Sequence, residues 1–393
     1  MRPDPLTLKA IGGDRLMDSL ELSTPYGRRQ LEMTDYSILP KEECIRHYQR
    51  IDRMPAYFIR HPQCLDRLKN RLGEIESVDS ILDHLSRPEI PLSLEEIFIL
   101  KKHLYVTRRL IEELRDTPFP LSGEADPMPS VWQWLDIDGQ ETPAFEYSCR
   151  HHPDLESARD AYRTLSRRQT ELGIQLRRET AERFNLKTVP ERLSLSNRDQ
   201  DALIDQLVRS GSFLICEKNF HNTILQLQPS PTQLELRQQQ IEIMDRIQRI
   251  EEQIRENLTR AIAPWSNRFT SNTQWIGSLD LDLARIAYAI RFKAVIPEIT
   301  EHRISLQQGR WVFFQQELEH RQWRYQPLEL NCTDRIHVIT GMNMGGKSVV
   351  LKTIGFLVFH LHLALPVPAV EARLPLFQRI FYSGGETRES SDG

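Results

Sequence analysis

The chain has 393 residues, 39% apolar and 27% charged, so it is large enough for more than one hydrophobic core. Its formal net charge of −4 at pH 7 shows no overall attraction to nucleic acid, which leaves only a local basic patch for that role. The five cysteines form no CxxC pair, which predicts reduced thiols and no zinc site. No segment is typical of a signal peptide or a membrane span.

Residues 1–150 contain apolar stripes at helical spacing and predict a helical domain. The stripes are Leu65, Leu68, Leu72 and Ile75, and then Ile97, Leu100, Leu104 and Leu110. Within this region, residues 24–31 read T-P-Y-G-R-R-Q-L. Arg28 and Arg29 either contact DNA or brace helices through carboxylates, and the second interpretation is favoured because it is the commoner use of such arginines. Residues 132–148 predict a β-hairpin, since Asp138-Gly139 is a strong turn signal between apolar pairs.

Residues 151–264 predict two long antiparallel helices that form an arm with a coiled-coil seam. The first begins near Pro153-Asp154 and the second after Pro231, and Pro264 ends the second. Between them, residues 213–217 and 223–227 predict a β-hairpin at the tip of the arm. The seam positions of the two helices are Leu155, Ala158, Tyr162, Leu165, Leu172 and Leu176, and then Leu236, Ile243, Ile247, Ile250, Ile254 and Leu258. Residues 279–288 predict a helix that returns the chain to the core.

A group of basic residues lies in or near the predicted tip: Arg177, Arg178, Arg183, Lys187, Arg192 and Lys218. Such residues can bind DNA phosphates without reading sequence. Glu179 and Glu182 are interleaved with them, so a solvated face of mixed charge is an equally good interpretation.

Residues 335–348 read R-I-H-V-I-T-G-M-N-M-G-G-K-S. Residues 335–340 predict a buried strand, and the apolar run 349–363 predicts a helix. A glycine loop ending in Lys347 and Ser348, placed between a strand and a helix, is the arrangement that holds a nucleoside triphosphate. Glycines let the backbone close around phosphates, and the first helical amides point at the anion. The alternative is a glycine-rich turn that binds nothing.

The residues in this loop resemble the P-loop of the MutS family, T-G-P-N-M-G-G-K-S, with Met342 in place of the family's proline. Residues 24–31, 279–288, 365–369 and 377–381 are also similar to family segments, although Gln378 replaces an aspartate. The resemblance implies a mainly α multidomain protein with a helical core, a lever/clamp arm and a partial α/β P-loop ATPase domain. The implied boundaries are 1–150 and 265–305 for the core, 151–264 for the arm, and 306–393 for the ATPase part.

The resemblance further implies ATP and Mg²⁺ as cofactors, with Ser348 as a metal ligand. Trp323 is expected to stack on adenine, and a role as a core tryptophan is the alternative. The other nucleotide-binding residues implied are Gly341, Asn343, Met344, Gly345, Gly346, Lys347 and Val349. The expected partners are duplex or branched DNA, held by the arm residues Arg177, Arg178, Arg183, Lys187 and Lys218, and a second copy held through the ATPase domains. The expected location is cytoplasmic.

Two departures from the family pattern shape these expectations. Only residues 1–23 precede the T-P-Y-G-R-R-Q-L segment, so the resemblance is to paralogues without an N-terminal mismatch-reading domain. No strand ending in paired acids follows Ser348, which suggests a truncated chain, a fragment or half of a split protein with poor turnover. Whether the chain is an ATPase therefore stays open. The alternatives are an ATP-dependent accessory protein acting on a protein or ribosome partner, and an inactive fragment.

Overall fold

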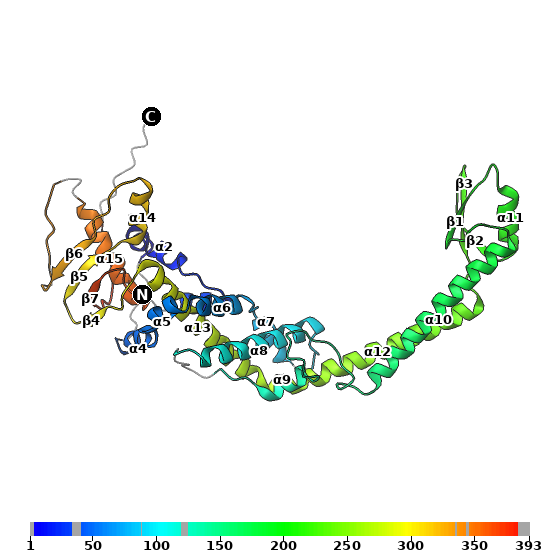
Figure 1. The fold of residues 1–393 in the computed structure, drawn as a ribbon, viewed down its shortest axis with the longest axis horizontal. Helices are drawn as coiled ribbons and strands as arrows, with labels where there is room; N and C mark the ends of the chain where they lie inside the picture. The colour runs from blue at the N-terminus through cyan, green and yellow to red at the C-terminus, as the bar shows by residue number, and fades with distance from the viewer. Residues whose placement is uncertain are drawn as a thin grey trace.

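The computed structural model describes residues 4–33, 41–87, 89–118, 125–334, 336–342 and 346–383. It consists of a body and a long arm that carries a small β-sheet unit at its far end (Figure 1). Most of the described residues are helical, and two small sheets complete the fold, which confirms the predicted mainly α, multidomain class. A bilayer crossing needs a long apolar helix, and the described part of the chain contains none.

The first part of the body is a stack of helices. In α8, Ser93 and Glu96 form a capping box that satisfies backbone groups at the start of the helix. The predicted apolar stripe on α8 is completely buried, so packing also stabilises this helix. The stripe on α6 is also core, which confirms both predicted stripes. The helices are α1 (Pro5–Ile11), α2 (Gly13–Asp18), α3 (Pro25–Met33), α4 (Lys41–Ile51), α5 (Met54–Arg60), α6 (Pro62–Gly73), α7 (Asp79–Leu85), α8 (Leu94–Arg115) and α9 (Pro129–Leu135).

The prediction of a β-hairpin at residues 132–148 is wrong, because these residues form no strand. Its first half is the short helix α9, which begins with Pro129 in its first turn and buries Val131, Trp132 and Leu135 on one side. The Trp132 ring stacks on Tyr105 of α8 at 6.1 Å between centroids. The turn signal itself holds, because Gly139 adopts a positive φ of 66°. Packing of one aromatic helical face therefore outweighed the local hairpin signal.

The arm consists of α10 (Asp154–Arg183) and α12 (Pro231–Ile262), which run antiparallel as predicted. Arg159 pairs with Glu251 at 3.1 Å, and Gln240 donates to the Ser166 hydroxyl at 3.1 Å, so the two helices run in opposite directions. As predicted, α12 ends at Ile262, just before Pro264, but the helical path continues beyond this proline. Pro264 lies in the single 3₁₀ turn η1 (Ala263–Trp265), and α13 (Ser266–Phe292) follows at once, because a proline is tolerated where a helix begins.

The tip unit comprises β1 (Arg192–Ser196), α11 (Asp201–Arg209), β2 (Phe213–Lys218) and β3 (Asn222–Leu227). The predicted hairpin is confirmed as β2–β3, and β1 adds a third antiparallel strand in the order β1-β3-β2. The unit has a small core of its own around Phe213 and Leu225. In Figure 1 the strands lie on the side of the tip nearer the body, and α11 lies on the far side.

The C-terminal lobe contains β4 (Glu298–Thr300), β5 (Ile304–Gly309), α14 (Val312–His320), β6 (Leu328–Cys332), α15 (Lys347–His362) and β7 (Glu371–Pro375). Its sheet has the order β4-β7-β5-β6, with β4 and β7 parallel. α15 is deeply buried in its second half, where α1 crosses it closely. A Cβ on Gly355 would lie 2.8 Å from Cγ2 of Ile11, so this crossing requires glycine.

The prediction of a buried strand at residues 335–340 is wrong. Arg335 lies outside the described residues, and residues 336–340 belong to no strand. Ile336 is 84% exposed and Val338 is 82% exposed. A strand is held by hydrogen bonds to its neighbours, and in the described ranges no strand lies beside this segment, since β6 pairs only with β5.

Residues 24–31 and the helix that contains residues 279–288 meet in the core of the body. The buried carboxylate of Asp280 on α13 accepts hydrogen bonds from the Ser23 and Thr24 amides and from the Thr24 hydroxyl, the last at 2.7 Å. A Cβ on Gly27 would lie 2.2 Å from this carboxylate, so only glycine fits there. The segment and the helix thus fasten the start of the chain to the helix that leads out of the arm.

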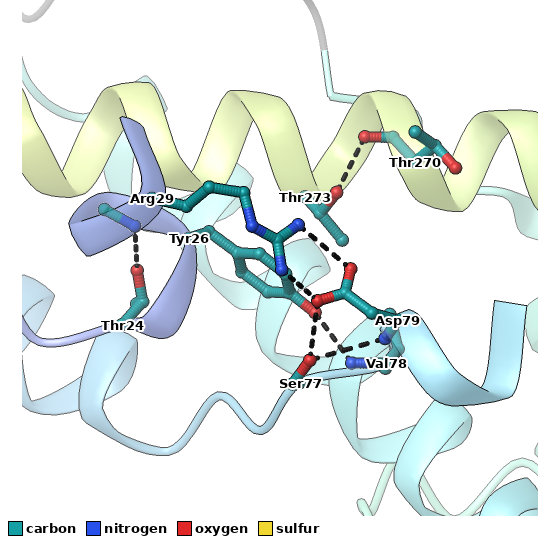
Figure 2. A network of polar contacts seen from close by, with 9 residues as sticks. Thr24, Tyr26, Arg29, Ser77, Val78, Asp79, Thr270 and Thr273 are labelled. Carbon is teal, nitrogen blue, oxygen red and sulfur yellow. Dashed lines mark hydrogen bonds and ion pairs between the residues drawn. The ribbon is translucent and has the colours of Figure 1, made fainter. Parts of the chain in front are cut away.

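Arg29, one of the two arginines in residues 24–31, braces two helices against each other. Arg29 forms an ion pair with Asp79, and the Tyr26 hydroxyl accepts a hydrogen bond from the Val78 amide at 2.7 Å (Figure 2). Both contacts join α3 to the start of α7. For Arg29 the favoured interpretation, bracing through a carboxylate, is confirmed. Arg28 is exposed.

Candidate functional site

The start of α15 has the geometry of an anion-binding helix terminus. Gly346 precedes the first helical residue, Lys347, with a left-handed φ of 81°, which favours glycine. The first four amides of any helix have no partner within the helix and can therefore point at an anion. The predicted loop-to-helix junction is thus present at Lys347, while Asn343, Met344 and Gly345 lie outside the described residues.

Lys347 is folded back over the loop that precedes it. Its ammonium donates hydrogen bonds to the Gly341 and Met342 carbonyl oxygens, both at 2.7 Å. Ser348 is exposed and Val349 is half-buried in the same helical turn. A cation and a hydroxyl thus lie on adjacent residues beside the loop, and these are the groups that a phosphate with its Mg²⁺ requires.

At this junction, Ser348 is the one described side chain that could ligate a metal ion. In the described ranges, no group of three or more histidine, cysteine, aspartate or glutamate residues is placed to hold a metal ion. The Ser348 hydroxyl suits Mg²⁺, which keeps several waters and takes further oxygens from phosphates. The residues present therefore fit Mg²⁺ that arrives together with a nucleotide.

Trp323 lies on the surface of the C-terminal lobe, after α14. Its side chain is 62% exposed, and the guanidinium carbon of Arg321 lies 6.0 Å from its ring centre. The alternative role as a core tryptophan is therefore wrong. An exposed indole with a cation on one side keeps its other face available for stacking.

We expect Trp323→Ala to change the free energy of unfolding by less than about 0.5 kcal/mol, as exposed side chains usually do. If the indole stacks on adenine, the same change weakens ATP binding about 2- to 12-fold, and Trp323→Phe keeps most of the affinity. Thermal melting and equilibrium titration measure the two effects. Trp275, which is 8% exposed on α13, is the contrast, since its alanine variant should lose about 3–5 kcal/mol of stability. Unchanged ATP affinity in Trp323→Ala would mean that the base has another partner.

The far end of α15 is fastened to the body by buried polar groups. Arg285 of α13 donates from Nε and Nη2 to the Leu363 carbonyl, at 3.2 and 3.0 Å, and from Nη1 to Asp282 at 3.0 Å. Arg50 of α4 forms an ion pair with the other oxygen of Asp282. Burial raises the pKa of Asp282, and the two guanidinium groups oppose that rise. We call Arg50, Asp282 and Arg285 the charge cluster.

A neutral histidine adds to this attachment. His360 is completely buried, and burial lowers its pKa to about 4. Its Nδ1 lies 2.7 Å from the Phe356 carbonyl, which can only accept, so Nδ1 carries the proton. Nε2 therefore accepts a hydrogen bond from the Tyr288 hydroxyl of α13 at 2.9 Å. α15 is thus joined to α13 by side chains at two successive turns.

The basic residues of the arm are brought to its outer end, and all five are exposed. Arg178 pairs with Glu182, with side chains 80% and 67% exposed, so the pair is weak. Arg183 lies over the Phe184 ring at 5.3 Å, and Arg177 donates to the Gly173 carbonyl. Lys187 follows α10, and Lys218 ends β2.

The strand β1, which the sequence analysis missed, gives the tip sheet an outer face where polar side chains lie beside the apolar Ile224 and Leu214. Leu193 and Leu195 of β1 face the core of the tip unit, so Arg192, Ser194 and Ser196 alternate onto the opposite side. Arg192 pairs in register with Gln226 of β3, and Ser196 with Asn222. The alternation R-L-S-L-S at 192–196 was the available signal for this strand.

Comparison with protein-family models gives no match to this chain. Among curated proteins, it is 31% identical over 154 residues to the Endonuclease MutS2 of Pediococcus pentosaceus, covering 39% of this chain and 19% of that protein. It is 21% identical over 390 residues to the DNA mismatch repair protein MutS of Staphylococcus haemolyticus, covering 96% of this chain and 43% of that protein. It is 23% identical over 338 residues to the DNA mismatch repair protein MutS of Thermotoga neapolitana, covering 84% of this chain and 40% of that protein. The chain spans less than half the length of these relatives.

Proposed function

From the membership of this chain in the MutS family, we propose that it is an ATP-binding protein that holds duplex or branched DNA with its arm. The proposed parts are a core (residues 1–150 and 265–305), the arm with its tip (151–264) and an ATPase part (306–393). A homodimer contact through the ATPase part, where Ile336 and Val338 are exposed, belongs to the same proposal.

The observation that carries the nucleotide proposal is the junction at Gly346. Its positive φ lets α15 begin directly at Lys347, so one cation, one hydroxyl and the first helical amides belong to the same first turn of the helix. ATP would be held there by Gly341, Gly346, Lys347, Ser348 and Val349, with Asn343, Met344 and Gly345 as further proposed contacts. The negative charge of bound ATP with Mg²⁺ would attract the Lys347 ammonium, which would then exchange the Gly341 and Met342 carbonyl oxygens for phosphate oxygens.

The proposal of nucleotide gating rests on the link between the two ends of the molecule. α15 begins at the proposed phosphate site and ends at the charge cluster on α4 and α13. α13 continues through η1 into α12, which reaches the tip unit. A movement of α15 along its axis would therefore act on the helix that carries the arm.

The DNA proposal rests on the side of the tip that faces the body. The strands lie there, and Arg192, Ser194 and Gln226 on the outer face of the sheet offer donors that suit a phosphate backbone. Arg177, Arg178, Arg183, Lys187 and Lys218 supply charge nearby. Such contacts would be independent of base sequence and sensitive to salt.

The test is charge reversal at the outer end of the arm. We expect Arg177→Glu, Arg183→Glu and Lys187→Glu together to weaken duplex binding several-fold at low salt and to make its salt dependence shallower. The matched control reverses Arg163, Arg167 and Arg168, which are exposed nearer the body on the same helix. Each triple variant changes the net charge from −4 to −10, because each reversal changes it by −2. A difference in DNA affinity between the two variants therefore depends on where the reversed charges lie. Absence of binding to duplex and branched DNA by the unaltered chain would contradict the proposal and favour a protein or ribosome partner.

A further inference from the structure

A single aromatic side chain projects from the end of the tip hairpin. Phe220 lies in the turn between β2 and β3, and its side chain is 84% exposed. The His221 ring contacts it edge-on, with centroids 5.3 Å apart. Burial therefore does not account for a phenylalanine at this position.

The turn that carries Phe220 is held firmly. The Asn219 side-chain oxygen accepts hydrogen bonds from the His221 and Asn222 amides, at 3.0 and 2.7 Å. The Asn197 side-chain amide donates to the Asn219 carbonyl at 2.7 Å, and the Asn197 backbone amide donates to the His221 carbonyl at 2.9 Å. Because the backbone is already ordered, a contact made by Phe220 costs little further entropy.

The surroundings of Phe220 are polar. The other exposed apolar residues of the hairpin, Leu214 and Ile215, lie in the first half of β2, six and five residues before Phe220. Near the turn are Lys218, Arg198 and Asn222, with Glu217 and Asp199 beside them. A protein-docking surface would gather several apolar side chains around its centre. A lone aromatic among amides, hydroxyls and cations suits the face of a nucleic-acid base.

We propose that Phe220 stacks on unpaired bases, so that the arm prefers DNA with gaps, loops or branch points to fully paired duplex. This inference rests on the proposed DNA binding and names its substrate class. In a paired duplex the faces of internal bases are covered by their neighbours, whereas an unpaired base offers an open face. Lys218, which ends β2, and Arg198, which follows the Asn197 that bonds to the turn, would contact the phosphates on either side of that base.

The test compares two fluorescent DNAs that differ only in an internal loop of unpaired thymines, by anisotropy titration at one fixed salt concentration. The unaltered chain is expected to bind the looped DNA more tightly. Phe220→Ala should weaken binding of the looped DNA about 5- to 150-fold and leave that of the paired duplex within about twofold. Phe220→Trp should retain the preference, since it keeps an aromatic face.

Ile241→Ala is the control, because Ile241 is an exposed apolar residue on α12, away from the tip sheet and its turn. It should change neither affinity. Equal binding of both DNAs by the unaltered chain, or equal losses on both DNAs in Phe220→Ala, overturns this inference and leaves the proposed function standing. Absence of binding to either DNA overturns the proposed function and this inference with it. All variants should melt at the temperature of the unaltered chain, because Phe220 lies outside the core.

Discussion

Lys347→Ala should abolish ATP binding, with a loss of affinity of at least about 100-fold, or about 2.7 kcal/mol. Lys347 is the cation that reaches back over the loop at Gly341 and Met342, and its ammonium would exchange these carbonyls for phosphate oxygens. Alanine cannot replace that charge, and it leaves the helix intact because alanine is the best helix former. Equilibrium titration with a fluorescent ATP analogue measures the loss.

Lys352 provides the control for this experiment. It lies five residues further along α15, and its ammonium lies over the Tyr382 ring, 5.5 Å from the centre. Lys352→Ala removes the same charge from the same helix and should leave ATP affinity within about twofold. An unchanged affinity in Lys347→Ala, or equal losses in both variants, would place the nucleotide elsewhere.

The second large effect is expected in the charge cluster. Arg285→Ala should lower the free energy of unfolding by about 3–5 kcal/mol, since it leaves the buried carboxylate of Asp282 short of one partner and the Leu363 carbonyl without its two donors. Chemical denaturation with a constant m-value measures this loss. Arg178→Ala is the matched control, because it breaks a largely exposed pair and should cost no more than about 1 kcal/mol.

A triple variant separates lost charge pairing from lost packing in the charge cluster. Replacing Arg50 and Arg285 with methionine and Asp282 with leucine removes every buried charge of the cluster at once. Apolar replacement of a whole buried ion network is often neutral or stabilising, so this variant should be more stable than Arg285→Ala. If it is less stable, the arginine stems and their contact with Leu363 matter more than the charges.

The features that could be predicted from the sequence are those set by local periodicity. The arm helices follow from a seam of leucine and isoleucine, and five of the six seam positions on α12 are buried. The start of α15 follows from the glycine-lysine-serine junction, whose backbone requirement is local. The contacts that fasten the body could not be read in this way, because Asp280 and Thr24 are separated by 256 residues in the chain.

The failures share a different cause. Residues 335–340 have the composition of a buried strand, but a strand exists only with neighbours, and Ile336 and Val338 are exposed in the described part of the molecule. Residues 132–135 contain two tryptophans that suit a strand equally well, yet their packing against α8 selects a helix. The strand β1 was missed because its five residues carry only a short alternation.

The unbroken path from α12 through η1 into α13 has a mechanical consequence. α10 has 30 residues, so the arm is about 45 Å long at 1.5 Å per residue. A tilt of about 5° at its base would displace the tip by about 4 Å, since the displacement is the arm length multiplied by the angle in radians. The arm would then behave as a lever whose fulcrum is the 3₁₀ turn at Pro264.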